Sequence, residues 1–537
     1  MVLPLPTTAP KKAPRRRRIG AKPGPFFRPR IRPPLPEPPP RNVALPINLL
    51  PREVAALVTI LPPESQLPPE VLCAMVLPRV PRANAILTTW SYLLQPKFLD
   101  DIFARHRGRS YEDILTFSAF VALIRDALVL HKGSALQSFQ RAEEQGILAT
   151  CQEAVYGKLR RMPIPLSLAF VEEITEQIRA LLPPDLQAEP LPASLAALTV
   201  VVLDGKQIKR VAKRLKPVRG RPGKVIGGKI LVAYVPAQGL GVAMAADPDG
   251  EANDIRLMPE AVPRARARIS GPRLWVADRQ FCDLTQPERL TEEGDHFLLR
   301  RSLKLSFHAD PDRPARETID GEGRRVIEQW GWMGAAKETR RRYVRQIQLV
   351  RPEEEDVYLV TDLLDERAYP ADDLLVVYLK RWKIEQVFQK ITEVFHLERL
   401  LGSTPEATIF QAAFCLVLYN LLQLMRVFVA ASQKDLPVES VSMEQLFLDV
   451  ERELTALVVL FPAAAISDWY KEEWSREEVM ARLWALLGGA WTPRYRKAIN
   501  KKPRPKVKKA KCSGAHTSVH KVREAERKKR QQRPGDQ

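Results

Sequence analysis

The sequence predicts an α/β core that follows a helical region and is flanked by two basic arms. The strongest observation is a continuous apolar run ending in an acid, LAALTVVVLD, which begins at Leu195 and is typical of a buried strand. Strand-like and helix-like segments then alternate up to about residue 300. A stretch of alternating strands and turns separates them from a long helical pattern that begins at Asp372. An α/β core interrupted by a β-rich insertion accounts for this order.

Length and composition exclude several classes of protein. At roughly 150 residues per domain, the 537 residues correspond to about three or four domains, and 45% hydrophobic residues suffice for a large core. The five cysteines include no C-x-x-C pair, which argues against a disulfide framework and a zinc ribbon. No apolar segment follows the basic residues 15–18, so no signal peptide is expected. The apolar residues 412–431 are interrupted by Asn420, Gln423 and Arg426, which predicts a buried helix and no membrane span.

The net charge of +21 is concentrated at the two ends of the chain. Residues 1–42 carry eleven Lys and Arg against one acid, with thirteen of the 47 prolines, and such a segment cannot form a packed core. Residues 493–537 carry seventeen Lys and Arg against three acids, whereas the 450 residues between the arms carry 56 bases and 59 acids. Cationic arms neutralise phosphates without reading a base sequence, so they indicate nucleic-acid binding. A solubilising tail, or the RNA-binding surface of a ribosome-associated protein, is the alternative.

The changes in composition along the chain predict a series of parts. These are a disordered Pro/Arg-rich basic arm over 1–50, a helical N-terminal DNA-binding domain over 51–190, the first part of the core over 191–300, a β-rich insertion over 301–371, the second part of the core over 372–435, a C-terminal helical region over 436–492 and a disordered basic tail over 493–537.

A possible DNA-reading element lies within the helical N-terminal region. Residues 134–163 read as two short helices around a turn at Gly146. The second of these helices carries Lys158, Arg160 and Arg161. A helix-turn-helix would place this basic helix in a DNA groove. An ordinary pair of surface helices is the alternative interpretation.

Two predicted strands end in an acid, Asp204 after VVVL and Asp278 after LWVA. In open α/β sheets, functional groups gather at the carboxyl ends of the strands. A buried ionised acid is costly unless it faces a positive partner, and two such acids favour Mg²⁺, which prefers carboxylate oxygens. Either acid alone could instead cap a turn or the following helix.

The helical pattern from Asp372 to Leu400 presents a narrow polar face. With Glu385 at zero and 100° per residue, Tyr378 falls at about +20°, Arg381 at about −40° and Thr392 at about −20°. Glu385 is therefore a candidate third carboxylate, and its neighbours on this face are candidates for binding phosphates. An ordinary salt bridge between Arg381 and Glu385 is the alternative.

A basic segment follows the first acid. Residues 206–229 carry ten Lys and Arg and no acid, which suits a loop that holds a DNA backbone, although a solvated loop has the same composition. The candidate DNA contacts here and beside the second acid are Lys206, Lys209, Arg210, Lys213, Arg214 and Arg279.

The residues around these positions resemble a known family. LDGK at Asp204, ADRQF at Asp278 and YLKRWKIEQVFQKIT at Glu385 resemble the DDE transposases of bacterial insertion sequences. The group most resembled has a Tyr-x2-Arg-x3-Glu-x6-Lys signature, and VYLVTDLLDERAYPADDLLVVYLKRWKIEQVF resembles its run into the third acid. The likeness covers about residues 110–430 in order and spacing and leaves both arms outside.

This resemblance implies an RNase H-like catalytic core interrupted by a β-rich insertion. It also implies that Asp204, Asp278 and Glu385 are catalytic and hold two divalent ions, Mg²⁺ or Mn²⁺. Two such ions activate a water or a DNA 3′-hydroxyl and stabilise the leaving oxygen of an in-line displacement.

The same resemblance assigns further residues of the helix. Tyr378 and Arg381 stand at the phosphate-binding positions of the signature, and Thr392 stands where the signature has lysine. The hydroxyl of Thr392 can bond a phosphate but brings no charge.

The function expected from the resemblance is cut-and-paste transposition of an insertion sequence. The expected partners are double-stranded DNA, as terminal inverted repeats and as target, and a second copy of the chain in the synaptic complex. No membrane partner is expected, and the protein is expected in the cytoplasm at the nucleoid. A stand-alone metal-dependent nuclease on the same core and an inert protein that only binds DNA are the alternatives.

Overall fold

The computed structural model describes residues 75–531 apart from 111, 184–187, 189, 210–224, 353, 398, 400, 434–435, 462, 471–472 and 498–516. The basic arm over 1–50 lies outside the described residues, as does the start of the predicted helical domain. Four candidate DNA contacts are affected: the side chain of Lys209 and the whole of Arg210, Lys213 and Arg214.

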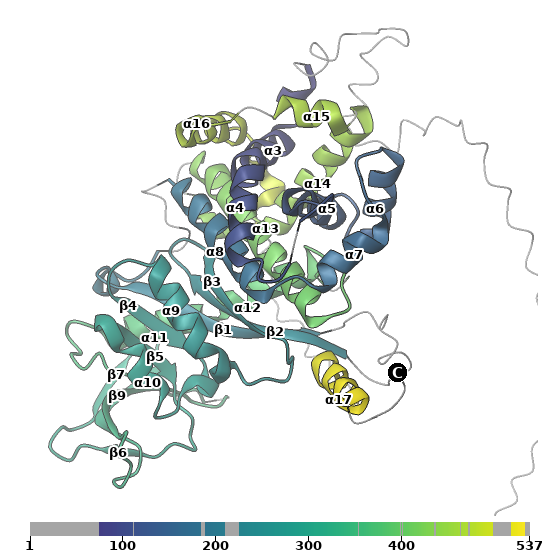
Figure 1. Cartoon of the computed structure of the whole chain (residues 1–537). Coiled ribbons are helices and arrows are strands. Elements are labelled where there is room, and N and C mark those ends of the chain that lie inside the picture. The colour runs from purple at the N-terminus through teal and green to yellow at the C-terminus, as the bar shows by residue number, and fades with distance from the viewer. Residues whose placement is uncertain are drawn as a thin grey trace, which may run out of the picture. The chain divides into compact units, whose positions relative to one another are not determined.

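The described strands form one eleven-stranded mixed sheet, seen at the lower left of Figure 1. Along the sheet the strands follow the order β11-β2-β1-β4-β5-β10-β9-β8-β6, with β3 also on β2 and β7 also on β8. β1 is parallel to β4, and β4 is parallel to β5, whereas β2 is antiparallel to both β1 and β3. The bounds are β1 (Thr199–Lys209), β2 (Val225–Val235), β3 (Leu240–Asp247), β4 (Arg273–Ala277), β5 (His296–Arg300), β6 (Phe307–Ala309), β7 (Arg316–Ile319), β8 (Arg325–Met333), β9 (Arg342–Leu349), β10 (Val357–Thr361) and β11 (Thr517–Ser518). This mixed α/β architecture is consistent with an RNase H-like core.

The predicted β-rich insertion continues the core sheet. β10 lies within residues 301–371, yet it pairs directly with β5 of the core on one side and with β9 on the other. Strand patterns in the sequence do not specify partners far along the chain, so this continuity was not predicted. Within the insertion, a turn at residues 321–325 joins β7 to β8, where Ile319 pairs with Arg325 and Gly323 has a φ of +78°.

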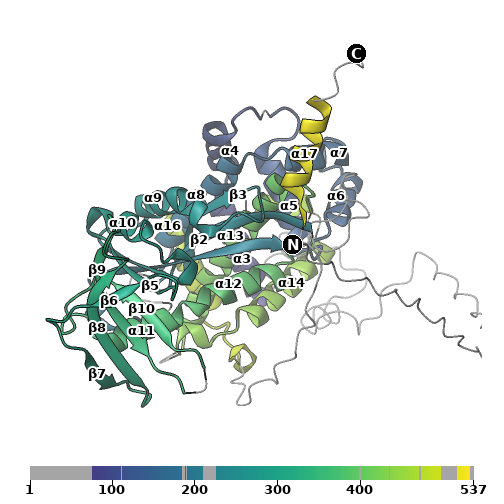
Figure 2. The same ribbon diagram turned by 90° about the horizontal axis from the view of Figure 1, so that it is seen from below.

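A helical layer packs beside the sheet and combines both ends of the described chain. The early helices α3 and α8 contact the late helices α13, α14 and α16, and the two views in Figures 1 and 2 agree on this arrangement. The early helices are α3 (Pro81–Leu93), α4 (Pro96–His106), α5 (Phe117–Val129), α6 (Ala135–Glu144), α7 (Gln152–Arg160) and α8 (Ile164–Ala180). The other described helices, in chain order, are α9 (Met258–Arg268), α10 (Gln286–Leu290), α11 (Ala371–Lys380), α12 (Trp382–Glu393), α13 (Pro405–Ala431), α14 (Met443–Leu460), α15 (Ala463–Trp469), α16 (Arg476–Leu487) and α17 (Val519–Gln531).

Helix α13 is the buried helix that the sequence predicts. By length and hydropathy it could cross a membrane, but its most apolar window is completely buried inside the fold. Its polar residue Asn420 bonds the N–H and the C=O of Gly241 in β3 and donates to Thr175 of α8. The bonds of this amide therefore join the helical layer to the sheet, because a buried polar group must be satisfied inside the protein.

The basic tail contains ordered structure that composition did not predict. β11 adds to β2 in parallel, and α17 follows it beside the sheet, in yellow in Figure 2. Val519 is completely buried, Val522 is 6% exposed, and Arg523 pairs with Glu406 at 3.0 Å. The expectation of a disordered tail over 493–537 is therefore wrong for residues 517–531, because two apolar residues and a set of ion pairs hold this basic helix. It is also wrong for the start of the tail, where Pro493–Tyr495 form a short 3₁₀ helix and Tyr495 is completely buried.

Candidate active site

Asp204 and Asp278 lie side by side because of the register between two parallel strands. Leu203 of β1 pairs with Ala277 at the end of β4, so the next residue of each strand is an acid. The expectation that Asp204 ends its strand is wrong, because β1 continues to Lys209 as the antiparallel partner of β2. The sequence did not show this continuation, since the residues after Asp204 are polar.

The third acid lies just after a break in the predicted long helix. The helical pattern divides into α11 and α12 at Arg381, which retains right-handed helical angles of −48° and −35°. The Arg381 N–H donates to the carbonyl of Tyr378, and its own carbonyl accepts from Ile384, so both bonds span three residues. This tighter turn keeps Tyr378, Arg381 and Glu385 close to one face, as the helical wheel predicts.

Arg381 links the first and third acids. Its Nη1 lies 3.5 Å from Oδ2 of Asp204, and its Nη2 lies 3.5 Å from Oε1 of Glu385. Its Cζ is 5.7 Å from the ring centroid of Tyr378, and the residue is only 7% exposed. The guanidinium is thus held between two carboxylates and an aromatic ring.

Tyr378 links the second acid to the same cluster. Its hydroxyl donates to Oδ1 of Asp278 at 3.3 Å, although the two residues are 100 positions apart. Burial, followed by the charge of Asp278, raises the pKa of the Tyr378 hydroxyl, so the phenol stays protonated and acts as a donor. The structure therefore brings all three predicted acids into one neighbourhood with the predicted Tyr and Arg.

The acids of this cluster are not fully neutralised. Burial raises the pKa of Asp204 to about 6, and the charges of Glu385 and Asp254 act in the same direction, against Arg381. Burial also raises the pKa of Glu385, with Asp278 adding to the effect and Arg381 opposing it. A site with such raised carboxylate pKa values favours the arrival of additional positive charge.

A fourth acid, Asp254, was missed by the sequence analysis. It is 4% exposed, its Oδ1 lies 2.6 Å from the ammonium of Lys229, and it accepts a bond from Gln280. A Cβ at Gly205 would lie 2.1 Å from Asp254 Oδ1, so glycine is required directly after Asp204 for this acid to pack there. The sequence signal was the Gly205 of LDGK, which shows a close approach but not its partner.

The residues of the cluster fit a divalent ion, although their carboxylates are not close enough together to form a metal site. Three carboxylates, with raised pKa values at two of them, are the oxygen ligands that Mg²⁺ and Mn²⁺ prefer. Within the part of the chain that the structure describes, no three His, Cys, Asp or Glu side chains are gathered closely enough to hold an ion. Arg381 lies between two of the three acids, so closer approach requires its guanidinium to move.

Two further predicted DNA contacts lie near this cluster. Lys206, two residues after Asp204, has its Nζ 5.7 Å from the ring centroid of Phe388 on α12, and its charge opposes the burial that raises the pKa of Glu385. Thr392 lies two turns beyond Glu385, where its hydroxyl donates to the carbonyl of Phe388 at 2.7 Å. Lys206 therefore faces the acids, and the Thr392 hydroxyl already has a partner in its own helix.

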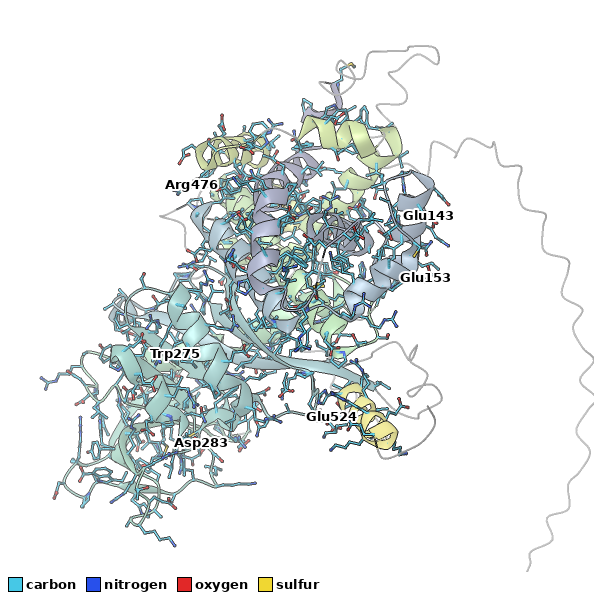
Figure 3. All side chains as sticks on the ribbon, viewed as in Figure 1. Glu143, Glu153, Trp275, Asp283, Arg476 and Glu524 are labelled. Carbon is cyan, nitrogen blue, oxygen red and sulfur yellow. The ribbon has the colours of Figure 1, made fainter. Side chains whose placement is uncertain are left out.

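The other predicted contacts are Arg279, directly after Asp278, and the basic residues of α7. Arg279 forms an ion pair of 2.9 Å with Glu355 at the surface. Residues 134–163 do form two helices around Gly146, which has a φ of +68°. Gln152 at the start of α7 donates to Glu143 on α6. Figure 3 labels Glu143 on α6 and Glu153 on α7.

The three basic residues of α7 differ in exposure. The Lys158 ammonium donates to the carbonyl of Leu115 at 2.6 Å and lies over the ring of Phe103, so it is used inside the protein. Arg160 and Arg161 are exposed at the end of the helix. Of the three, the two arginines are therefore the ones accessible to DNA.

Comparison with known proteins gives a match to one family model. Residues 196–421 match the family model described as "Transposase DDE domain", a segment that includes Asp204, Asp278, Asp254 and Glu385. No curated protein matches the chain. The family match indicates a DDE transposase, an enzyme of nucleic-acid phosphoryl transfer. DNA is therefore the implied partner, and divalent metal ions are typical of the family.

Proposed function

We propose that the chain cuts and joins DNA at the two ends of an insertion sequence, with Asp204, Asp278 and Glu385 as its catalytic acids. The observation that carries this assignment is the shared contact of Arg381 with Asp204 and Glu385, beside the Tyr378–Asp278 bond. The route is cut-and-paste, and the active species is a dimer that holds both ends, acting in the cytoplasm on chromosomal DNA.

The three acids would hold divalent cations, which supply activation of the attacking oxygen and stabilisation of the leaving oxygen when bound. Arg381 holds the carboxylates in place before the cations arrive, since its guanidinium already contacts two of them. Its guanidinium would also suit a DNA phosphate, because its paired N–H groups match two phosphate oxygens. The Tyr378 hydroxyl orients Asp278 and remains a donor at neutral pH.

The first prediction concerns the acids. Asp204→Asn, Asp278→Asn and Glu385→Gln each keep shape and remove one charge, so cleavage in Mg²⁺ or Mn²⁺ should fall by at least about a hundredfold. DNA affinity should stay nearly constant, because the basic arms are unchanged. The measurement is cleavage of a labelled duplex that contains the DNA flanking the coding segment.

Glu393→Gln is the matched control, since this exposed acid lies two turns beyond Glu385 on α12. Its activity should equal that of the unchanged protein. Equal cleavage by all three acid variants would contradict the assignment of the site. No cleavage by any protein, with DNA binding intact, would favour the inert DNA-binding alternative.

A further inference from the structure

Asp254 is a buried acid that lies between the segments of the chain that carry the first two catalytic acids. It begins the short 3₁₀ helix before α9 and is only 4% exposed. Its Oδ2 accepts a hydrogen bond from Gln280, two residues after Asp278. Its Oδ1 packs against Gly205, directly after Asp204, where there is no room for a side chain on the glycine. Asp254 therefore contacts both of these segments at once.

The contact with Gly205 affects how the carboxylate of Asp204 is held. The Gly205 N–H donates to Oδ1 of Asp204 at 2.9 Å, and the other oxygen of Asp204 faces Arg381 at 3.5 Å. The position of the Gly205 backbone thus sets the orientation of this carboxylate, and the side chain of Asp254 limits where that backbone can move. The two acids are also coupled by charge, because Asp254 adds to the effect of burial in raising the pKa of Asp204.

The bond from Gln280 connects Asp254 to the second catalytic acid. The carbonyl of Asp278 accepts the N–H of Phe281 at 3.0 Å, which closes the short 3₁₀ turn that contains Gln280. Because this turn starts directly at Asp278, the position of Gln280 depends on that of the acid. The bond between Gln280 and Asp254 therefore restrains the end of β4 relative to β1.

A lysine of β2 holds the carboxylate of Asp254 in place. The Lys229 ammonium lies 2.6 Å from Oδ1 of Asp254, and it donates to the carbonyl of Ala252 at 2.8 Å. A buried carboxylate is costly without such a partner. A buried ion pair adds little net stability compared with apolar packing, so its presence beside the catalytic acids favours a role in the site.

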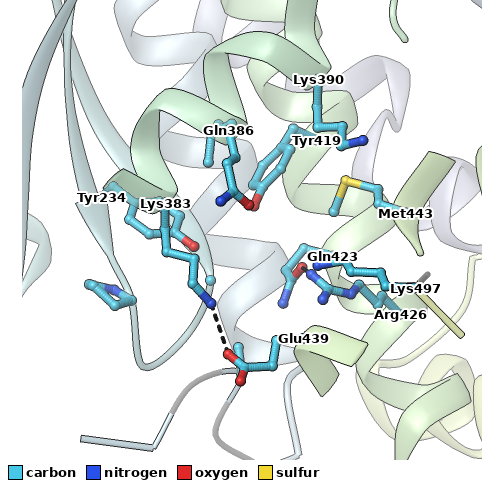
Figure 4. A pocket seen from close by; sticks show the side chains of 14 residues that line it. Tyr234, Lys383, Gln386, Lys390, Tyr419, Gln423, Arg426, Glu439, Met443 and Lys497 are labelled. Carbon is cyan, nitrogen blue, oxygen red and sulfur yellow. Dashed lines mark hydrogen bonds and ion pairs between the residues drawn. The ribbon is translucent and has the colours of Figure 1, made fainter. Parts of the chain in front are cut away.

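The neighbouring helix α12 directs its first lysine to the other side. Lys383 lies about 160° from Glu385 on the helical wheel. Figure 4 shows it in a pocket where it pairs with Glu439 at 2.9 Å. The cation beside Asp254 is therefore supplied by β2, from the same sheet as the first two catalytic acids.

We infer that Asp254 is a positioning residue, which holds the segments of Asp204 and Asp278 at the separation needed to share a divalent cation. This inference rests on the proposed function, in which those acids bind the cation. Residues that support the ligands of a metal typically change its affinity by about ten- to a hundredfold when they are replaced. Asp254 should therefore act on cation binding without being a ligand itself.

Binding of Mn²⁺ to the full chain without DNA, followed by electron paramagnetic resonance, tests this role. Asp254→Asn should weaken Mn²⁺ binding about tenfold. Asp295→Asn is the matched control and should leave Mn²⁺ binding unchanged, since Asp295 is also buried and paired, with Arg266 at 2.8 Å, but lies directly before β5, at the opposite edge of the sheet from Asp278. Gln280→Ala changes an exposed residue and keeps the buried ion pair, so it should weaken binding in the same direction even if Asp254→Asn does not fold.

Asp204→Asn serves as the reference for a direct ligand. Unchanged Mn²⁺ binding in Asp254→Asn and Gln280→Ala, with weaker binding in Asp204→Asn, would overturn the positioning role and leave the proposed function intact. Unchanged binding in Asp204→Asn would overturn both. In DNA cleavage, saturating Mn²⁺ should restore the rate of Asp254→Asn but not that of Asp204→Asn. A rate of Asp254→Asn that does not recover would make Asp254 a ligand and contradict the positioning role.

Discussion

At the scale of single residues, the ionised carboxylate of Asp204 destabilises the folded protein but is suited to binding a cation. The carboxylate is buried, lies near Glu385 and Asp254, and contacts Arg381 only at 3.5 Å. Its pKa is raised from 3.8 to about 6, so the ionised form present at pH 7 is disfavoured by the fold. Replacing this charge should therefore stabilise the protein, as often happens at functional sites.

Asp204→Asn is expected to raise the free energy of unfolding at pH 7 by up to about 3 kcal/mol, since each pKa unit corresponds to about 1.4 kcal/mol. Urea denaturation in the presence of a chelator measures the difference, and added Mg²⁺ should stabilise the unchanged protein but not the variant. Asp312→Asn, which removes an exposed acid, is the control and should have little effect. A less stable Asp204→Asn protein would show that the carboxylate is a structural group.

Some residues of the candidate site could be predicted from the sequence and others could not, for a physical reason. Tyr378, Arg381 and Glu385 lie on one helical stripe, and helical periodicity is a local property that the sequence contains. Asp254 reaches the site from a short turn before α9, through the space left by Gly205. No local pattern encodes that approach, since it depends on how β1 and the turn pack in three dimensions.

At the scale of elements, the seam between β5 and β10 joins the insertion to the core sheet. His296 at the start of β5 contacts Asp362 just after β10, with Nδ1 2.9 Å from Oδ2, and the other oxygen of Asp362 accepts the N–H of Phe297 at 2.8 Å. The hydrogen bond to Asp362 raises the pKa of His296 above its usual 6.5. The seam is thus strengthened by an ion pair that depends on pH.

The sign of this dependence follows from the raised pKa. The folded protein holds the His296 proton more tightly than the unfolded chain, so the stabilisation is complete below about pH 6.5 and is lost as the pH rises through the folded value. His296→Gln should therefore cost about 1 kcal/mol at pH 5.5 and less at pH 9. Urea denaturation at both pH values measures this, with exposed His308→Gln of β6 as the control. A difference that does not change with pH would contradict the proposed ion pair.

The strands themselves were more predictable than their pairing. The strands at VVVL and LWVA follow from apolar runs that end in an acid. The continuation of β1 past Asp204 and the pairing of β10 with β5 do not, because hydrogen bonds to distant strands stabilise backbone whose own sequence is polar or ambiguous.

At the scale of the whole molecule, the first and the last described segments both pack against parts of the chain that are distant in sequence. The early helices pack on α13, α14 and α16, and the last described segment returns to the edge of β2. Ser518 donates to Asp249 at 2.9 Å, and Lys521 pairs with Glu251, so the tail is fixed beside the loop after β3. The basic tail therefore combines a docked helix with the lysine-rich residues 498–516 that precede it.

These two parts of the tail should be separable by mutation. Replacing the six lysines of residues 498–516 with glutamine should lower the salt slope of DNA binding by several units, since each lost phosphate contact removes about one. These lysines are Lys501, Lys502, Lys506, Lys508, Lys509 and Lys511. Val519→Ala with Val522→Ala should instead weaken docking of α17 by about 2 kcal/mol, because buried methyl groups are lost. Amide hydrogen exchange over residues 519–531 should then be faster in the valine variant and unchanged in the lysine variant. If the valine variant lowers the salt slope as much as the lysine variant does, α17 itself is the part of the tail that binds DNA.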